Sequence, residues 1–146
     1  MIMRRVKRGL LNEFNSTRFD YILRDDDSLG YEMNVFIFGR DKFSHSNRKI
    51  LIENRSLDDF ALSVFRFFAL GKKPEISIRK GTRFNPLYST SEEEIRAFLK
   101  LHRLKEGRNK IRKSDKPLLD MLHSLEERRP GAMLSIVSIG RRIGLI

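Results

Sequence analysis

The spacing of apolar residues near the start of the chain predicts a helix over residues 4–14. Val6, Leu10 and Phe14 recur every four positions, which places them on one face of a helix, and basic residues occupy much of the remaining surface. The polar residues 15–17 then end the segment. We therefore expect a short helix with one apolar stripe and a basic face.

Three short strands are predicted next, over residues 19–23, 31–38 and 50–52. The second strand contains the continuous apolar run from Val35 to Phe38, which is typical of a strand buried on both faces. A polar turn at residues 25–30 separates the first two strands. A hairpin is the simplest connection between them.

A helix is predicted over residues 57–70, and a further strand over residues 75–79. Ser56 can cap the helix, the acidic residues in its first turn favour the positive end of the helix dipole, and Gly71 suits its end. The inner face of this helix is expected to contain Leu57, Ala61, Val64, Phe65 and Phe68.

Three helices are predicted in the last third of the chain. The first begins at Ser91, which has the capping-box spacing to Glu94. The second begins at residues 114–117, with a proline in its first turn, and the third covers residues 133–143. Further buried positions are expected at Ile95, Phe98, Leu99, Leu122 and Leu125, with His102 partly buried as a structural residue.

These elements predict an α/β fold with a short, mainly parallel sheet flanked by helices, and with an N-terminal helix and hairpin. The chain has 146 residues, which fits a single domain over residues 1–146. At this length a hydrophobic core can form without disulfides or a structural metal.

The net charge indicates an anionic partner. Thirty Lys and Arg residues against nineteen Asp and Glu residues give +11 at pH 7, a field that attracts polyanions. The stretch 100–116 alone holds eight Lys and Arg residues and two acidic ones, so it can be a solvated loop or can follow a phosphate backbone. The candidate nucleic-acid-binding residues are Arg4, Arg5, Lys7, Arg8, Lys100, Arg103, Lys105, Arg108, Lys110, Arg112 and Lys113.

The absence of cysteine limits the possible chemistry. It excludes disulfides, thiolate metal sites and cysteine nucleophiles, and the three histidines show no ligand spacing, so no metal site and no cofactor are expected. No signal peptide is readable at the N-terminus and no apolar run is long enough to span a membrane. A cytoplasmic protein without a membrane partner is therefore expected.

Four segments, in this order, resemble the C-terminal half of PP-loop ATP-pyrophosphatases, and most closely the tRNA 2-thiolation branch. They are a strand and helix at 49–71, which contain Asn54-Arg55-Ser56-Leu57-Asp58-Asp59, an Arg-Phe-Asn-Pro-Leu stretch at 83–87, a helix at 94–104, and a segment at 118–136 with a Pro-Gly pair. The resemblance assigns residues 49–143 as a PP-loop-like portion and leaves residues 1–48, a helix plus hairpin, unassigned.

Departures from the family bear on its chemistry. The family's Ser-Gly-Gly-x-Asp-Ser phosphate loop is absent, Arg55 stands where the family has histidine, and the cysteines that the thiolation enzymes use are missing. The resemblance implies that Asp58 and Asp59 could hold ATP with magnesium, whereas the residues alone indicate that two aspartates simply favour a helix N-terminus. Independent catalysis is therefore not expected.

The sequence leaves three functional hypotheses. The first is a nucleic-acid-binding protein, with tRNA as the partner, that resembles a degenerate tRNA-modifying PP-loop protein and can assist a partner enzyme. The second is a protein-interaction subunit that forms homo-oligomers or completes a partner's sheet. The third is a metal-dependent nuclease that uses residues 25–27 or the Asp58–Asp59 pair, although adjacent side chains diverge and make a poor metal site.

Overall fold

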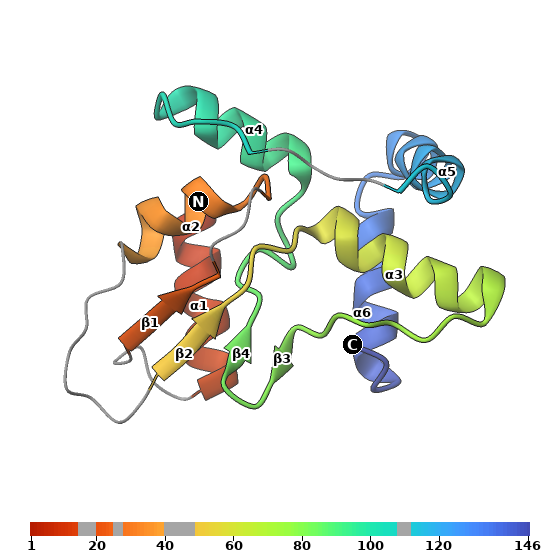
Figure 1. The fold of residues 1–146 in the computed structure, drawn as a ribbon. Coiled ribbons are helices and arrows are strands. Elements are labelled where there is room, and N and C mark those ends of the chain that lie inside the picture. The colour runs from red at the N-terminus through yellow and green to blue at the C-terminus, as the bar shows by residue number, and fades with distance from the viewer. Residues whose placement is uncertain (15–19, 25–27, 40–48, 108–111) are drawn as a thin grey trace.

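The computed structural model describes residues 1–14, 20–24, 28–39, 49–107 and 112–146 (Figure 1). Four strands form one sheet in the order β1-β2-β4-β3. Strands β1 (Asp20–Leu23), β2 (Lys49–Ile52) and β4 (Arg83–Phe84) run parallel, and β3 (Arg79–Lys80) pairs antiparallel with β4. The predicted α/β class with a short, mainly parallel sheet is confirmed.

Six helices surround this sheet among the described residues. Figure 1 shows α1 behind the strands, α4 above them, and α3, α5 and α6 grouped on the side beyond β3. They are α1 (Ile2–Phe14), α2 (Tyr31–Phe38), α3 (Leu57–Leu70), α4 (Glu92–Leu101), α5 (Lys116–Arg128) and α6 (Ala132–Arg142). Because α3 follows β2 and α4 follows β4, both helices begin beyond the carboxyl ends of parallel strands.

The predicted hairpin is wrong. Residues 31–38 form the helix α2, and β1 pairs in parallel with β2. Here a continuous apolar run belongs to a short helix, because such a run does not distinguish a buried strand from a buried helix. The helix places Met33 in the core and buries Asn34, whose side-chain amide donates to the Oδ1 of Asn54 at 2.8 Å.

The strand predicted over residues 75–79 is also misplaced. Only Arg79 belongs to a strand, and the hairpin turns at Gly81, whose φ of 60° lies in the left-handed region that favours glycine. Ile78 is nevertheless buried. The alternation of Ile76 and Ile78 therefore marked a partly buried segment that lies outside the sheet and leads into β3.

The local signals for helix ends are confirmed. Ser56 and Ser91 each form a full capping box at the start of α3 and α4, and Gly71 ends α3 in the left-handed conformation. Pro117 lies in the first turn of α5. These features depend on residues within a few positions of one another, which is why sequence alone located them.

Two apolar clusters form the core. One joins α1, the sheet, α3, α5 and α6, and the other joins α1, α2 and α4. Val64, Ile95, Leu99 and Leu122 are buried as predicted, and Phe65 and Phe98 are half-buried. Three expectations are wrong, because Phe68 is 57% exposed, Leu125 is 37% exposed and His102 is exposed: each lies at the solvent-facing margin of its helix.

Candidate functional site

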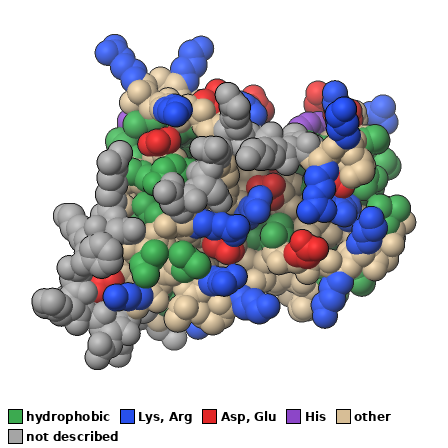
Figure 2. Space-filling model, in the orientation of Figure 1, with side chains coloured by type: hydrophobic (Ala, Val, Ile, Leu, Met, Phe, Trp, Pro, Cys, Tyr) green, Lys and Arg blue, Asp and Glu red, His purple; other side chains and the backbone are tan. Residues whose placement is uncertain are grey.

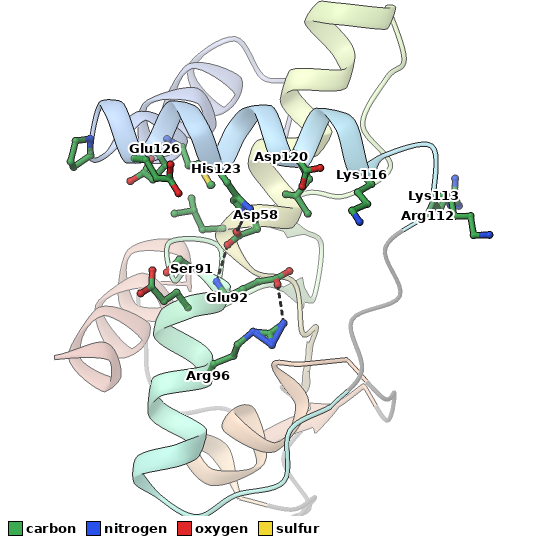
Figure 3. A pocket seen from close by; sticks show the side chains of 16 residues that line it. Asp58, Ser91, Glu92, Arg96, Arg112, Lys113, Lys116, Asp120, His123 and Glu126 are labelled. Carbon is green, nitrogen blue, oxygen red and sulfur yellow. Dashed lines mark hydrogen bonds and ion pairs between the residues drawn. The ribbon is translucent and has the colours of Figure 1, made fainter.

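A cavity of about 980 Å³ opens between the start of α3, the start of α4 and one face of α5 (Figure 3). The helices bring together residues far apart in the chain: Asp58 from α3, Glu92 and Arg96 from α4, and His123 from α5. Leu57, Leu119 and Met133 supply apolar wall. The cavity thus combines apolar walls with a few converging polar groups, which is typical of ligand sites.

Asp58 is the polar centre of this cavity. It is buried, with only 4% exposure, and its carboxylate accepts the backbone N–H of Glu92 at 2.8 Å. Its other oxygen lies 2.9 Å from Nε2 of His123. One carboxylate therefore satisfies the N-terminus of α4 and holds an imidazole on α5, as the dashed lines in Figure 3 show.

Glu92, the first residue of α4, has the most perturbed acidity in the site. Burial, and then the neighbouring charges of Asp58 and Asp59, raise its pKa to about 7. Arg96 lies 3.4 Å away and acts in the opposite direction. Near neutral pH the Glu92 carboxyl can therefore gain or lose a proton, the property that a general acid or base needs.

A complete nucleophilic site is not assembled by these groups. Among the described residues that line the cavity, Ser91 alone carries a hydroxyl group, and its Oγ accepts the backbone N–H of Glu94 as a helix cap. Within the described ranges, no group of three or more His, Asp and Glu side chains could hold a metal ion. The arrangement can bind and exchange protons, and it offers no aligned nucleophile and base.

The two adjacent aspartates do not converge. Asp59 accepts the backbone N–H of Ser56 at 2.9 Å, and burial raises the pKa of its carboxyl. It lines a second cavity of about 400 Å³ together with Arg55, Arg66 and Arg112, and Arg112 also lines the larger cavity. Each carboxylate thus caps a helix N-terminus and faces its own cavity.

A buried polar network follows the carboxyl ends of β2 and β4. The side-chain amide of Asn85 donates to Glu53 at 2.9 Å and to the carbonyl of Ser77 at 2.8 Å, and its oxygen accepts the N–H of Arg55 at 3.3 Å. Asn54 donates to the carbonyl of Arg24 at 2.8 Å. The network fixes the loop that leads into α3 and hence the position of Asp58.

The candidate nucleic-acid-binding residues fall into three groups. Arg4, Lys7 and Arg8 are exposed on α1, and Lys100, Arg103 and Lys105 are exposed at the end of α4 and just beyond it. Arg112 and Lys113 line the larger cavity. Arg108 and Lys110, together with the acidic residues 25–27, lie outside the described residues.

Arg5 has a different position from its neighbours. It donates to the carboxylate of Glu94 at 2.7 Å and to the carbonyl of Ser89 at 3.2 Å, so it attaches α1 to the start of α4. Val6 of α1 and Leu99 of α4 belong to the same apolar cluster. Two of the basic groups are therefore carried by helices that pack together. On the face drawn in Figure 2, Lys and Arg side chains project over α4, and others are spread among acidic residues over the rest of that face.

Sequence reasoning missed Glu92, His123 and the asparagine network. The capping box located the start of α4, and Asp58 was noted as a helix-start residue, but the two lie 34 positions apart. No local spacing indicates that the carboxylate of Asp58 caps the N-terminus of α4 at Glu92. Their meeting depends on the packing of three helices.

Comparison with known proteins gives a likeness of fold. The sequence matches no model of a known protein family and no curated protein. Among solved structures, the fold is similar to that of the U34-tRNA thiolase NcsA from Methanococcus maripaludis with its 4Fe–4S cluster, with a TM-score of 0.52 and 23% sequence identity. The match covers 64% of this chain and 36% of the thiolase, and it supports the PP-loop-like fold expected from the sequence.

Among the described residues, none of the helices combines the length and the apolar character needed to cross a membrane.

Proposed function

We propose that this chain binds RNA, with tRNA as the partner, and that it is a tRNA-modification-related PP-loop-like protein without catalysis of its own. The observation that carries the proposal is the excess of eleven positive charges, with exposed cations on α1 and α4, two helices joined by Arg5 and Glu94. The fold likeness to a tRNA thiolase supports the choice of tRNA.

The chemistry of the thiolase is not proposed for this chain. Iron–sulfur clusters are held chiefly by cysteine thiolates, and the chain contains no cysteine, so its residues do not fit a 4Fe–4S cluster of that kind. The Ser-Gly-Gly-x-Asp-Ser loop that would bind ATP phosphates is also absent. A partner enzyme would have to supply the reaction.

Fluorescence anisotropy with labelled tRNA across a salt series tests this function. Neutralised phosphates release counterions, so the logarithm of the binding constant should fall linearly with the logarithm of salt concentration, with a slope of about −0.7 to −0.9 for each phosphate contacted. ATP and magnesium added in parallel should leave the affinity unchanged. If tRNA binds no better at low salt than to a neutral control protein, the RNA proposal fails.

A second candidate is an interaction subunit that forms homo-oligomers. Helix α6 packs on α3 through Gly140, yet Leu134 and Ile139 on α6 and Ile143 just after it are between 44% and 56% exposed. Exposed apolar side chains on one element can mark a protein interface. Light scattering at high protein concentration tests this candidate, and a monodisperse monomer would count against it.

A further inference from the structure

Three aromatic rings, from α2 and from the end of α4, form a ring cluster in which Phe36 and Phe98 meet edge to face at 78° and His102 is tilted by 43° and 39° to them. The ring of Phe36 on α2 lies 4.6 Å from the ring of His102 and 5.4 Å from that of Phe98, centroid to centroid, and Phe98 lies 4.3 Å from His102. Phe36 is 45% exposed and His102 is exposed, whereas Phe98 is half-buried, so two rings of the cluster are open to solvent. An imidazole and a phenyl ring held together at a surface present flat faces that a further ring can cover.

Cations lie close in sequence to this ring cluster. Lys100, Arg103 and Lys105 are all exposed and lie within three positions of His102. Glu106, which follows these residues, is paired with Arg96. Glu32 lies one turn before Phe36 on α2, so three exposed cations stand against one further acid close to the ring cluster in sequence.

Arg103 occupies a conformation that favours glycine. Its φ is 55°, and among the described residues other than glycine it alone has a positive φ. The N–H of Leu104 donates to the carbonyl of Leu99 at 2.9 Å, which is the hydrogen bond that closes a helix end over a left-handed residue. The left-handed residue therefore closes the end of α4, and the side chain at this position is an exposed arginine next to His102.

We infer that Phe36, His102 and Arg103 form a binding site for unpaired nucleotides of RNA, in which a base stacks on the rings and Arg103 and the adjacent lysines contact the backbone. Aromatic stacking beside cations is the physical basis of single-strand recognition, because every base has a flat face and every nucleotide a phosphate. Bases in a duplex are stacked on each other and cannot reach the rings. The inference rests on the proposed RNA-binding function and names the part of the RNA that the protein contacts.

Binding should therefore prefer single strands. We would compare a short single-stranded RNA, labelled with the fluorescent base 2-aminopurine, with the duplex of the same sequence at one salt concentration. Protein should quench the 2-aminopurine in the single strand through stacking, and the duplex should bind more weakly. Equal affinity for both forms with no quenching overturns the inference, while tRNA binding itself would still support the RNA-binding function.

Variants locate the stacking surface. Phe36→Leu combined with His102→Ala should weaken single-strand binding about tenfold and abolish the quenching, since stacking on one aromatic side chain contributes on that order. Phe68→Leu is the matched control, because Phe68 is a 57% exposed aromatic residue on α3, outside the ring cluster. Equal effects of the two changes would overturn the inference.

Arg103→Gly separates binding from folding. Glycine adopts a positive φ without the cost that arginine incurs, so this variant should have a higher melting temperature than the wild type. It should also bind single-stranded RNA several-fold more weakly. A variant that keeps full affinity would show that Arg103 has no part in binding. A loss of binding by every variant, including Phe68→Leu, would show that the effect is not local to these residues and would overturn the inference.

Discussion

The pKa of Glu92 is raised by burial and then by the carboxylates of Asp58 and Asp59, which are distant in the chain. This shift makes the stability of the protein depend on pH. With its pKa raised from 4.5 to about 7, the folded protein holds the Glu92 proton more tightly than the unfolded chain. The stabilisation is therefore fully present below about pH 4.5 and is lost as the pH rises through about 7. Burial raises the pKa of Asp59 as well, and its contribution has the same sign.

Replacing Glu92 by glutamine should remove most of this dependence. At about pH 8 we expect Glu92→Gln to raise the free energy of unfolding by on the order of 1 kcal/mol, after allowing for solvent screening. At about pH 4 the difference should nearly vanish. Chemical denaturation at both pH values measures the effect, with Glu93→Gln, an exposed acid on the same helix turn, as the control. A variant that is less stable than the wild type at the higher pH would contradict the expectation.

Asn85 is the residue on which the buried polar network depends. It is fully buried, and both ends of its amide are hydrogen-bonded to groups in different segments. Asn85→Ala should lower the free energy of unfolding by about 2–4 kcal/mol, because it removes several bonds and leaves buried partners unsatisfied. Asn12→Ala, at an exposed position of α1, should change it little. Urea denaturation compares the two, and equal effects would show that the network adds no stability.

Sequence predicted single residues well where their partners are local. Ser56, Ser91 and Gly71 act on backbone groups within a few positions, and each was located correctly. Glu92 and His123 could not be found in this way, since their environment is made by Asp58 from another helix. The same limit explains why His102 was expected to be partly buried: its helical face was identified, but not where that face meets solvent.

At the scale of elements, the close contact between α3 and α6 determines how the last helix packs. A Cβ atom added to Gly140 would lie 2.6 Å from Cγ2 of Val64 and 3.4 Å from the side chain of Ile146. Only glycine allows the two helices to approach this closely. Sequence patterning identified both helices, but not that a glycine within α6 faces a valine on α3.

Gly140→Ala should therefore destabilise the protein. We expect a loss of about 1–3 kcal/mol in the free energy of unfolding, the usual cost of overpacking a core. In a protein that already carries Val64→Ala, the Gly140→Ala change should cost less than it does in the wild type, because the colliding methyl groups of Val64 are gone. Ser138→Ala, on the exposed side of α6, is the control. Additive losses in the double variant would indicate that the two residues are not in contact.

The error at α2 shows what element prediction lacks. Residues 31–38 are apolar at enough positions to suit either a strand or a buried helix, and the length of eight residues suits both. The decision comes from the rest of the fold. Because β1 pairs in parallel with β2, the chain must cross over between them, and α2 lies in that crossover.

At the scale of the whole molecule, the RNA proposal predicts that the cations on and near α1 and α4 contribute more to tRNA binding than exposed cations elsewhere. Replacing Arg4, Lys7, Lys100 and Lys105 by glutamine should weaken tRNA binding and reduce the magnitude of the salt slope by up to about three, if all four contact phosphates. The matched control replaces Lys80, Arg128, Arg129 and Arg142, four exposed cations elsewhere. Anisotropy titrations measure both, and equal slopes would mean that the surface attracts tRNA without a defined site.

The fold class was predictable because several independent patterns agreed on it. Strand-like segments near residues 20 and 50, with amphipathic helices predicted before the first and after the second, indicated an α/β arrangement, and the ordered resemblance over residues 49–143 pointed to a PP-loop-like fold. Strand pairing was not predictable, because it depends on contacts between segments that no local pattern specifies.

The first and last helices share one core, which affects how the chain can fold as it is synthesised. Leu10 of α1 packs in the same cluster as Met133 and Val137 of α6, and Glu13 pairs with Arg141 across almost the whole sequence. Helix α1 therefore lacks part of its packing until α6 has been synthesised. A nascent chain halted before α6 would carry an unfinished core, and a chaperone that shields α1 during translation would cover apolar side chains that α6 later covers.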